Sequence, residues 1–326
     1  MHRRSVLALV LFAALALAAA AQADGGGPGT GATVGWDGAI APGGKIRYVA
    51  VPAGSSTAVQ AISTSDGRVV RFGSLLGAFG IPMLTQNGDT GGVSADGKTL
   101  VLAELAQGGP TLRTVSHFVV FNPNRLDLPD ELFLPGDLAF DAISPHGKTI
   151  YLIQHMTSQD LSRYVVRAYD VRHRRLLPGR IADRTQKGWV MQGYALTRMT
   201  SDDGRWAYTL YQNPGGYPFI HALDTVRGVA HCIGIPWKGS DQNGLWNVRM
   251  TLHDGGKQLA VHWKSGRPFL NVDTSTWRVS AADGSFAWGA VAAGMAAAVA
   301  LAVLVLLLLR RRRPAMFRFA KPEVAA

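Results

Sequence analysis

Short runs in which apolar and polar positions alternate cover most of the chain, and turn residues separate them. Two examples, at 149–153 and 206–211, are rich in β-branched and aromatic residues. In three places a third strand-like run follows about 20 residues later and ends in Asp170, Asp224 or Asp273. A fourth strand-like run comes after each of them. No amphipathic helical spacing interrupts them. The pattern predicts units of four β-strands in an all-β protein.

Each unit contains a turn in which Gly directly precedes Lys or Arg. The five copies of this turn and the strand after it occupy residues 42–48, 94–100, 144–150, 201–207 and 253–259. Their glycines at 44, 97, 147, 204 and 256 recur every 50 to 57 residues. Asp-Gly, His-Gly and Gly-Gly pairs supply the positive φ that a tight hairpin requires. A recurrence this regular indicates a repeat architecture.

The motif Ser-x-Asp-Gly-Lys at 94–98, and its variant Ser-Pro-His-Gly-Lys at 144–148, each precede an apolar strand. With the later strand that ends in Asp, this resembles the bacterial YVTN-type and WD-repeat-like β-propellers over about residues 31–285. The resemblance implies a β-propeller of five four-stranded blades; six or seven blades, or a β-sandwich, are the alternatives. The first copy lacks Ser and Asp, and the fifth opens with His253. The motif defines architecture better than function.

The N-terminus has the organisation of a secretory signal peptide. Arg3 and Arg4 precede an apolar stretch, and Ala21 and Ala23 form an A-x-A cleavage site. We therefore expect residues 1–23 to be a signal peptide and 24–33 to be a Gly-rich N-terminal segment of the mature chain. An uncleaved anchor is the alternative, and the paired arginines leave Sec and twin-arginine export both open.

A second apolar segment, residues 287–309, lies near the C-terminus and contains no charge. A helix of this length spans about 35 Å, enough for a bilayer core of about 30 Å. Because Arg310, Arg311, Arg312 and Arg313 follow at once, the positive-inside rule places the tail, 310–326, in the cytoplasm.

These ends predict a single-pass cell-membrane protein whose β-propeller ectodomain, 34–285, is extracytoplasmic. A stripe of small residues along the transmembrane helix could also allow a homodimer. The stripe consists of Ala290, Gly294, Ala298 and Ala302.

Composition excludes several classes of protein. The chain has 326 residues, is 47% hydrophobic and contains one cysteine, so neither a disordered chain nor a disulfide scaffold fits. Two long apolar runs are too few for a polytopic transporter. Of the net charge of +11, the signal peptide carries +2 and the tail +5, which leaves +4 on the exported part. No nucleic-acid partner is therefore expected.

Candidate chemistry is sparse. The nine histidines show no spacing that would place two of them on one metal, and no nucleophile elbow or phosphate loop is present. We expect Asp170, Asp224 and Asp273 to cap turns, and Cys232 to be a buried inert thiol. The sequence thus predicts no catalytic residue, metal or cofactor, and favours a binding protein over an enzyme without settling the question.

The loops at one end of the blades combine aromatic residues with amides, a composition suited to a glycan, a peptide or an envelope protein. The candidate binding residues are His155, Trp189, Asn213, Tyr217, Trp237, Asp241, Asn243 and Trp246. The structural alternative is that the tryptophans pack between blades and the amides only form loops. The functional alternatives are a hydrolase or lyase acting on external polymers and a sensor that works through a membrane partner.

Overall fold

The computed structural model describes residues 32–33, 38–105, 111–126, 129–185, 190–238 and 240–282. The expected signal peptide, transmembrane helix and basic tail lie outside these ranges. Within the described ranges, no helix is long and apolar enough to cross a membrane. The chain divides into two compact units, 1–279 and 280–326, and the sheets considered below are built almost wholly from the first.

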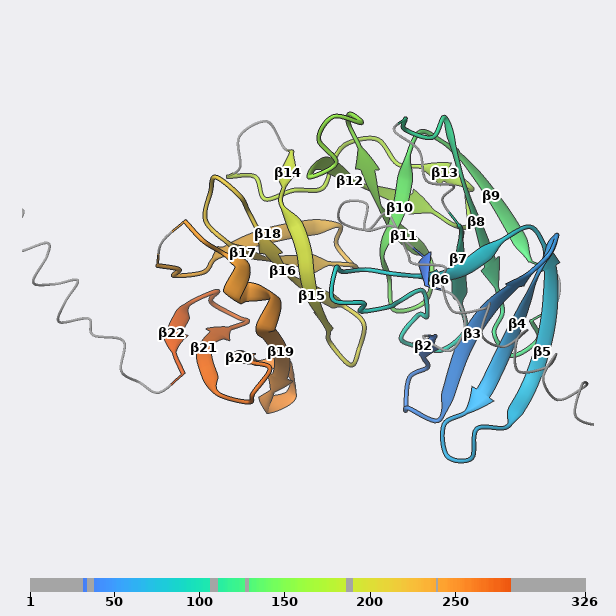
Figure 1. Ribbon diagram of the computed structural model, residues 1–326, viewed down its shortest axis with the longest axis horizontal. Coiled ribbons are helices and arrows are strands. Elements are labelled where there is room, and N and C mark those ends of the chain that lie inside the picture. Colours follow the sequence, from blue (N-terminus) through green and yellow to red (C-terminus); the bar gives the residue numbers. More distant parts are fainter. Residues whose placement is uncertain are drawn as a thin grey trace, which may run out of the picture. The chain divides into compact units, whose positions relative to one another are not determined.

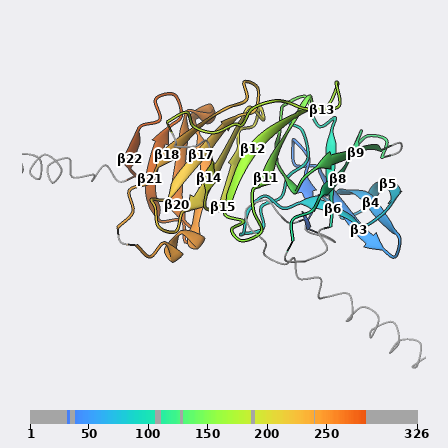
Figure 2. The same ribbon diagram turned by 90° about the horizontal axis from the view of Figure 1, so that it is seen from above.

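The described strands form five antiparallel sheets, numbered I to V, which follow one another in chain order (Figures 1 and 2). Sheet I comprises β2 (Ala39–Ile40), β3 (Ile46–Ala53), β4 (Ser56–Ser63) and β5 (Val69–Leu76). Sheet II comprises β6 (Phe79–Pro82), β7 (Leu100–Glu104), β8 (Val115–Phe121) and β9 (Asp130–Pro135), with β1 (Ala32–Thr33) beside β6. Sheet III comprises β10 (Leu138–Ile143), β11 (Thr149–His155), β12 (Arg163–Asp170) and β13 (Arg175–Leu176), with β14 (Met191–Gln192) beside β12.

Sheet IV comprises β15 (Tyr194–Thr200), β16 (Trp206–Gln212), β17 (Phe219–Asp224) and β18 (Val229–Gly234). Sheet V comprises β19 (Val248–His253), β20 (Gln258–Trp263), β21 (Pro268–Asp273) and β22 (Val279–Ala281). Two short 3-10 helices, η2 (Asn243–Asn247) and η3 (Asp254–Gly256), adjoin β19. Successive strands pair as up-and-down neighbours, which is the organisation of β-propeller blades. The prediction of an all-β chain with repeated four-stranded units is therefore confirmed for the described residues.

The repeated turns join the first and second strands of each sheet. All five glycines have positive φ, as at Gly147, where φ is 67°. The motif serine closes the turn, because Ser144 Oγ accepts the Thr149 N–H at 2.9 Å. The aspartates that end the third strands also cap turns; Asp224 Oδ1, for example, accepts the N–H groups of Val226 and Arg227 at 3.0 Å. These local predictions are confirmed.

Hydrophobic cores lie between consecutive sheets. Tyr48 of sheet I packs with Phe79 of sheet II, and Val101 of sheet II belongs to a core with Leu152 of sheet III. Two further clusters join sheet III to sheet IV and sheet IV to sheet V. Among the described residues, no cluster combines sheet V with sheet I. Each inner sheet therefore buries both faces, whereas sheets I and V each supply one face to a core.

The loop between β6 and β7 links sheets that are distant in the sequence. The N–H of Gln86 donates to Ala195 O at 2.8 Å, and the N–H of Asn87 donates to Leu196 O at 3.3 Å, both in β15. The Asn87 side chain also donates to Trp246 O at 3.2 Å. This loop of sheet II therefore reaches sheet IV and the segment before sheet V, and it carries Asp89 to the first strand of sheet IV.

Candidate functional site

Six of the eight candidate binding residues gather at one end of sheets IV and V. They lie on the β16–β17 loop and on the connection from β18 to β19. We call this surface the sheet IV–V loop face. It comprises residues 212–217, Trp237, 240–247 and the β20–β21 loop at 264–267. Its candidate residues are Asn213, Tyr217, Trp237, Asp241, Asn243 and Trp246.

One buried amide holds the loops together. Gln242 is 4% exposed, and its Oε1 accepts the Asn213 N–H at 2.8 Å. Its Nε2 donates to Asn213 O at 3.0 Å and to Gly216 O at 2.9 Å. These bonds fix the two loops relative to each other. The sequence does not single out Gln242 as a positioning residue, because its partners lie about 30 positions earlier.

Two aromatic side chains on this face remain accessible. Tyr217 is 77% exposed and Trp246 is 38% exposed. The indole N–H of Trp246 donates to Gln212 Oε1 at 3.2 Å, so the ring is oriented although it is partly in solvent. Oriented, exposed aromatic rings lose little conformational entropy when a partner covers them. These two residues are the best placed of the candidates for contact with a ligand.

Other candidates have supporting contacts within the protein. The Trp237 ring lies 6.2 Å from the ring of Trp263 and 5.9 Å from that of Phe269, against the core of sheets IV and V. Its indole N–H donates to Asp241 O at 2.7 Å. Asp241 Oδ1 accepts the Asn243 N–H at 2.8 Å. For Trp237 the structure thus agrees with the alternative that the ring packs rather than binds.

The remaining two candidates are not part of this face. Trp189 lies outside the described residues. The side chain of His155, at the end of β11, has no exposed surface, and its ring nitrogens have no hydrogen-bond partner among the described residues. His155 Nδ1 is 3.7 Å from Asp137 Oδ1, and Arg113 donates to the same oxygen at 2.8 Å. Although burial opposes ionisation, His155 and Arg113 lower the pKa of Asp137 to about 2.

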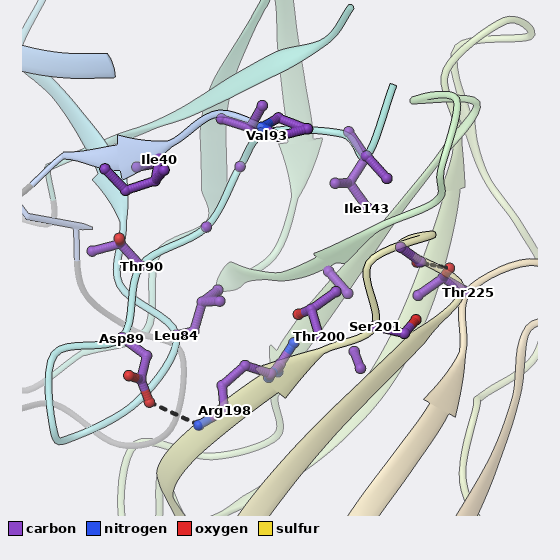
Figure 3. A pocket seen from close by; sticks show the side chains of 18 of the residues that line it. Ile40, Leu84, Asp89, Thr90, Val93, Ile143, Arg198, Thr200, Ser201 and Thr225 are labelled. Atoms are coloured by element: carbon purple, nitrogen blue, oxygen red, sulfur yellow. Dashed lines mark hydrogen bonds between the residues drawn. The ribbon is translucent and has the colours of Figure 1, made fainter. Parts of the chain in front are cut away.

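A second feature is a cavity of about 680 Å³ among the first strands of the sheets (Figure 3). Strands β2, β10 and β15 and the β6–β7 loop contribute most of its walls. Within it, Arg198 Nη2 donates to Asp141 Oδ1 and Arg198 Nη1 donates to Asp141 O at 2.9 Å. The side chains of Arg198 and Asp141 are 6% and 3% exposed. Asp89 Oδ2 accepts the backbone N–H of Arg198 at 2.7 Å and the hydroxyl of Thr85 at 2.9 Å.

The cysteine, Cys232, is half-buried and is held in an unreactive state. Cys232 Sγ lies 3.8 Å from His221 Nδ1, and the Cys232 N–H donates to Asp183 Oδ2 at 2.7 Å. Burial raises the pKa of the Cys232 thiol to about 12 and lowers the pKa of His221 to about 4. Both groups are therefore neutral near pH 7, and the thiolate that a nucleophile needs is not formed.

The described residues contain no group of three or more His, Cys, Asp or Glu side chains that could hold a metal ion. No protein-family model matches the sequence, and no curated protein matches it.

Solved structures show distant likeness. Kuenenia stuttgartiensis hydrazine synthase has 16% identity and a TM-score of 0.40, covering 72% of this chain and 75% of its own. TolB from Acinetobacter baumannii has 15% identity and a TM-score of 0.40, and the match covers 74% of this chain and 55% of the TolB chain. The β-propeller domain of Cps50 (Swd1) from Myceliophteria thermophila has 10% identity and a TM-score of 0.39, and the match covers 72% of this chain and 64% of that domain's chain. Likeness this low carries no functional argument.

Proposed function

We propose that the protein is an interaction module that presents the sheet IV–V loop face to another protein of the cell envelope. The proposal includes export by the signal peptide at 1–23 and anchoring by a helix at 287–309, with the tail in the cytoplasm. The observation that carries it is a pair of exposed aromatic side chains, Tyr217 and Trp246, on loops fixed by buried Gln242, with the Trp246 ring oriented by Gln212.

The residue types on this face favour a protein partner over a glycan. Trp, Tyr and Arg are the side chains most enriched among residues that dominate protein–protein binding. Besides Tyr217 and Trp246, the face carries exposed Arg267, whose guanidinium lies 5.1 Å above the ring of Trp263. A stacked guanidinium keeps its hydrogen-bond donors available for an acceptor on the partner.

The test is co-purification from envelope membranes with the full-length protein in lipid nanodiscs. Trp246→Ala and Tyr217→Ala should each lower the yield of a stoichiometric partner about tenfold or more, as loss of a dominant interface side chain does. Val226→Ala is the matched control, because Val226 is 61% exposed but lies on the β17–β18 turn at the opposite end of sheet IV. It should leave the yield unchanged.

Two results would contradict the proposal. One is a partner retained equally by the two aromatic variants and the control. The other is binding on a glycan array that both aromatic substitutions abolish, in the absence of a protein partner, since this would make the face a glycan site. The topology is tested separately: protease added to intact cells should digest the sheets and spare the tail, and protection of the sheets would refute it.

A further inference from the structure

The cavity among the first strands is separate from the sheet IV–V loop face and has the dimensions of a ligand site. Its volume of about 680 Å³ falls within the range of about 300–1,000 Å³ usual for small-molecule pockets. Ile40 is 47% exposed, and exposed Gly43 and Asp202 also line the space, so these residues mark its opening. Buried Phe140 and Ala207 mark its depth.

The walls combine an apolar surface with a small polar region. The apolar side chains that surround the polar groups are Ile40, Leu84, Val93, Phe140 and Ile143. Figure 3 shows Asp89 and Arg198 on facing segments, joined by the bond from the Arg198 backbone to the Asp89 carboxylate. A ligand that fits must therefore offer both an apolar group and polar groups.

The charges of the lining decide the sign of that ligand. Among the described lining residues, Asp89, Asp141 and Asp202 are acidic and Arg198 is the only basic side chain. Because the guanidinium of Arg198 is paired with Asp141, the half-buried carboxylate of Asp89 has no cationic partner among the described residues. This arrangement favours a cation and disfavours an anion. The site therefore presents a carboxylate for a cation beside apolar walls.

We propose that this cavity binds the free amino terminus of a peptide whose first side chain is apolar. The α-ammonium group meets Asp89, and the apolar side chain packs on the walls near Leu84 and Ile143. Placing this site in the cavity makes it independent of the loop face, so each can fail without the other.

Isothermal titration calorimetry of the full-length protein in nanodiscs, with three synthetic peptides, tests the proposal. Leu-Gly-Gly has every required group, N-acetyl-Leu-Gly-Gly lacks the cation, and Asp-Gly-Gly replaces the apolar side chain with a carboxylate. Leu-Gly-Gly should bind, and each of the others should bind about tenfold or more weakly. The acetylated peptide loses the charged hydrogen bond to Asp89, and Asp-Gly-Gly loses the apolar contact and adds a carboxylate near acidic side chains. Equal binding of the acetylated peptide, or absence of Leu-Gly-Gly binding, overturns the proposal.

Variants locate the site. Asp89→Asn should reduce the preference for Leu-Gly-Gly over its acetylated form about tenfold, while the amide oxygen can still accept the Arg198 N–H. Asp254→Asn makes the same charge change on exposed η3, away from the cavity, and should have no effect. An unchanged preference in Asp89→Asn refutes the assignment.

A second pair of variants is independent of the charge. Ile40→Trp should narrow the opening and weaken Leu-Gly-Gly binding about tenfold, whereas Val115→Trp, similarly exposed on β8 but outside the lining, should not. Unaltered binding in Ile40→Trp would exclude the cavity as the site even if Asp89→Asn failed to fold.

Discussion

The buried ion pair between Arg198 and Asp141 gives the sharpest stability prediction. Asp141→Ala removes the carboxylate and leaves a guanidinium that is 6% exposed without its anionic partner. An uncompensated charge of this kind costs about 3–5 kcal/mol. In a protein of this size, where 1 kcal/mol corresponds to about 2–4 °C, the Tm should fall by about 10 °C. Differential scanning calorimetry of the full-length protein in nanodiscs measures the change.

An exposed pair of the same chemistry serves as the control. Arg174 and Asp130 also form an ion pair, but their side chains are 55% and 43% exposed. Solvent screens such a pair, so Asp130→Ala should lower the Tm by no more than about 4 °C. Similar losses for the two substitutions would show that Arg198 reaches water or another anion, and the account of the buried pair would be wrong.

Three further outcomes follow from named contacts. Burial lowers the pKa of His221 from 6.5 to about 4, so the unfolded state binds a proton more readily than the folded state. The free energy of unfolding should therefore decline by about 3 kcal/mol as the pH falls from 6.5 to 4, and denaturant titrations of His221→Gln should not show this decline. Ser144→Ala should cost about 1 kcal/mol, because the Thr149 N–H loses its acceptor, and calorimetry showing no loss would contradict the role of the motif serine. Gln242→Ala should speed hydrogen exchange at the Asn213 amide without changing the core; unchanged exchange there would mean that other contacts hold the loop.

The features that the sequence predicts correctly are local. A turn glycine, a serine that accepts the N–H five residues later, and an aspartate that caps the next turn all act within one short segment, as at Gly147, Ser144 and Asp170. Their energies depend on neighbouring backbone atoms, so the residue pattern suffices to define them. The same regularity gives the spacing of the four-stranded units, although each sheet begins one strand before its turn.

The features that the sequence misses are contacts between residues of different sheets or loops. Asp141 and Arg198 are 57 positions apart, and Asp141 lies at a register shift in the pairing of β10 with β11. Strand alternation does not reveal a residue displaced by a bulge. Gln242 is missed for a related reason, since an amide in a polar loop resembles a surface residue until its partners are known. The sequence also cannot separate Trp246, which is accessible, from Trp237, which packs on Trp263.

The pattern of burial along β11 and along β20 follows from the cores on the faces of their sheets. In β11 of sheet III, the four consecutive side chains from Ile150 to Ile153 are each no more than 2% exposed, because cores cover both faces. In β20 of sheet V, buried Leu259 and Val261 alternate with half-buried Ala260 and His262. A sheet that shares one face with a neighbour needs apolar side chains at every second position only. Burial along β11 therefore matches the inner position of sheet III, and one-sided burial along β20 matches a sheet with one covered face. The residue types alone do not show the difference, because Leu259, Ala260 and Val261 are all apolar and β3 of sheet I buries Tyr48, Val49 and Ala50 in succession.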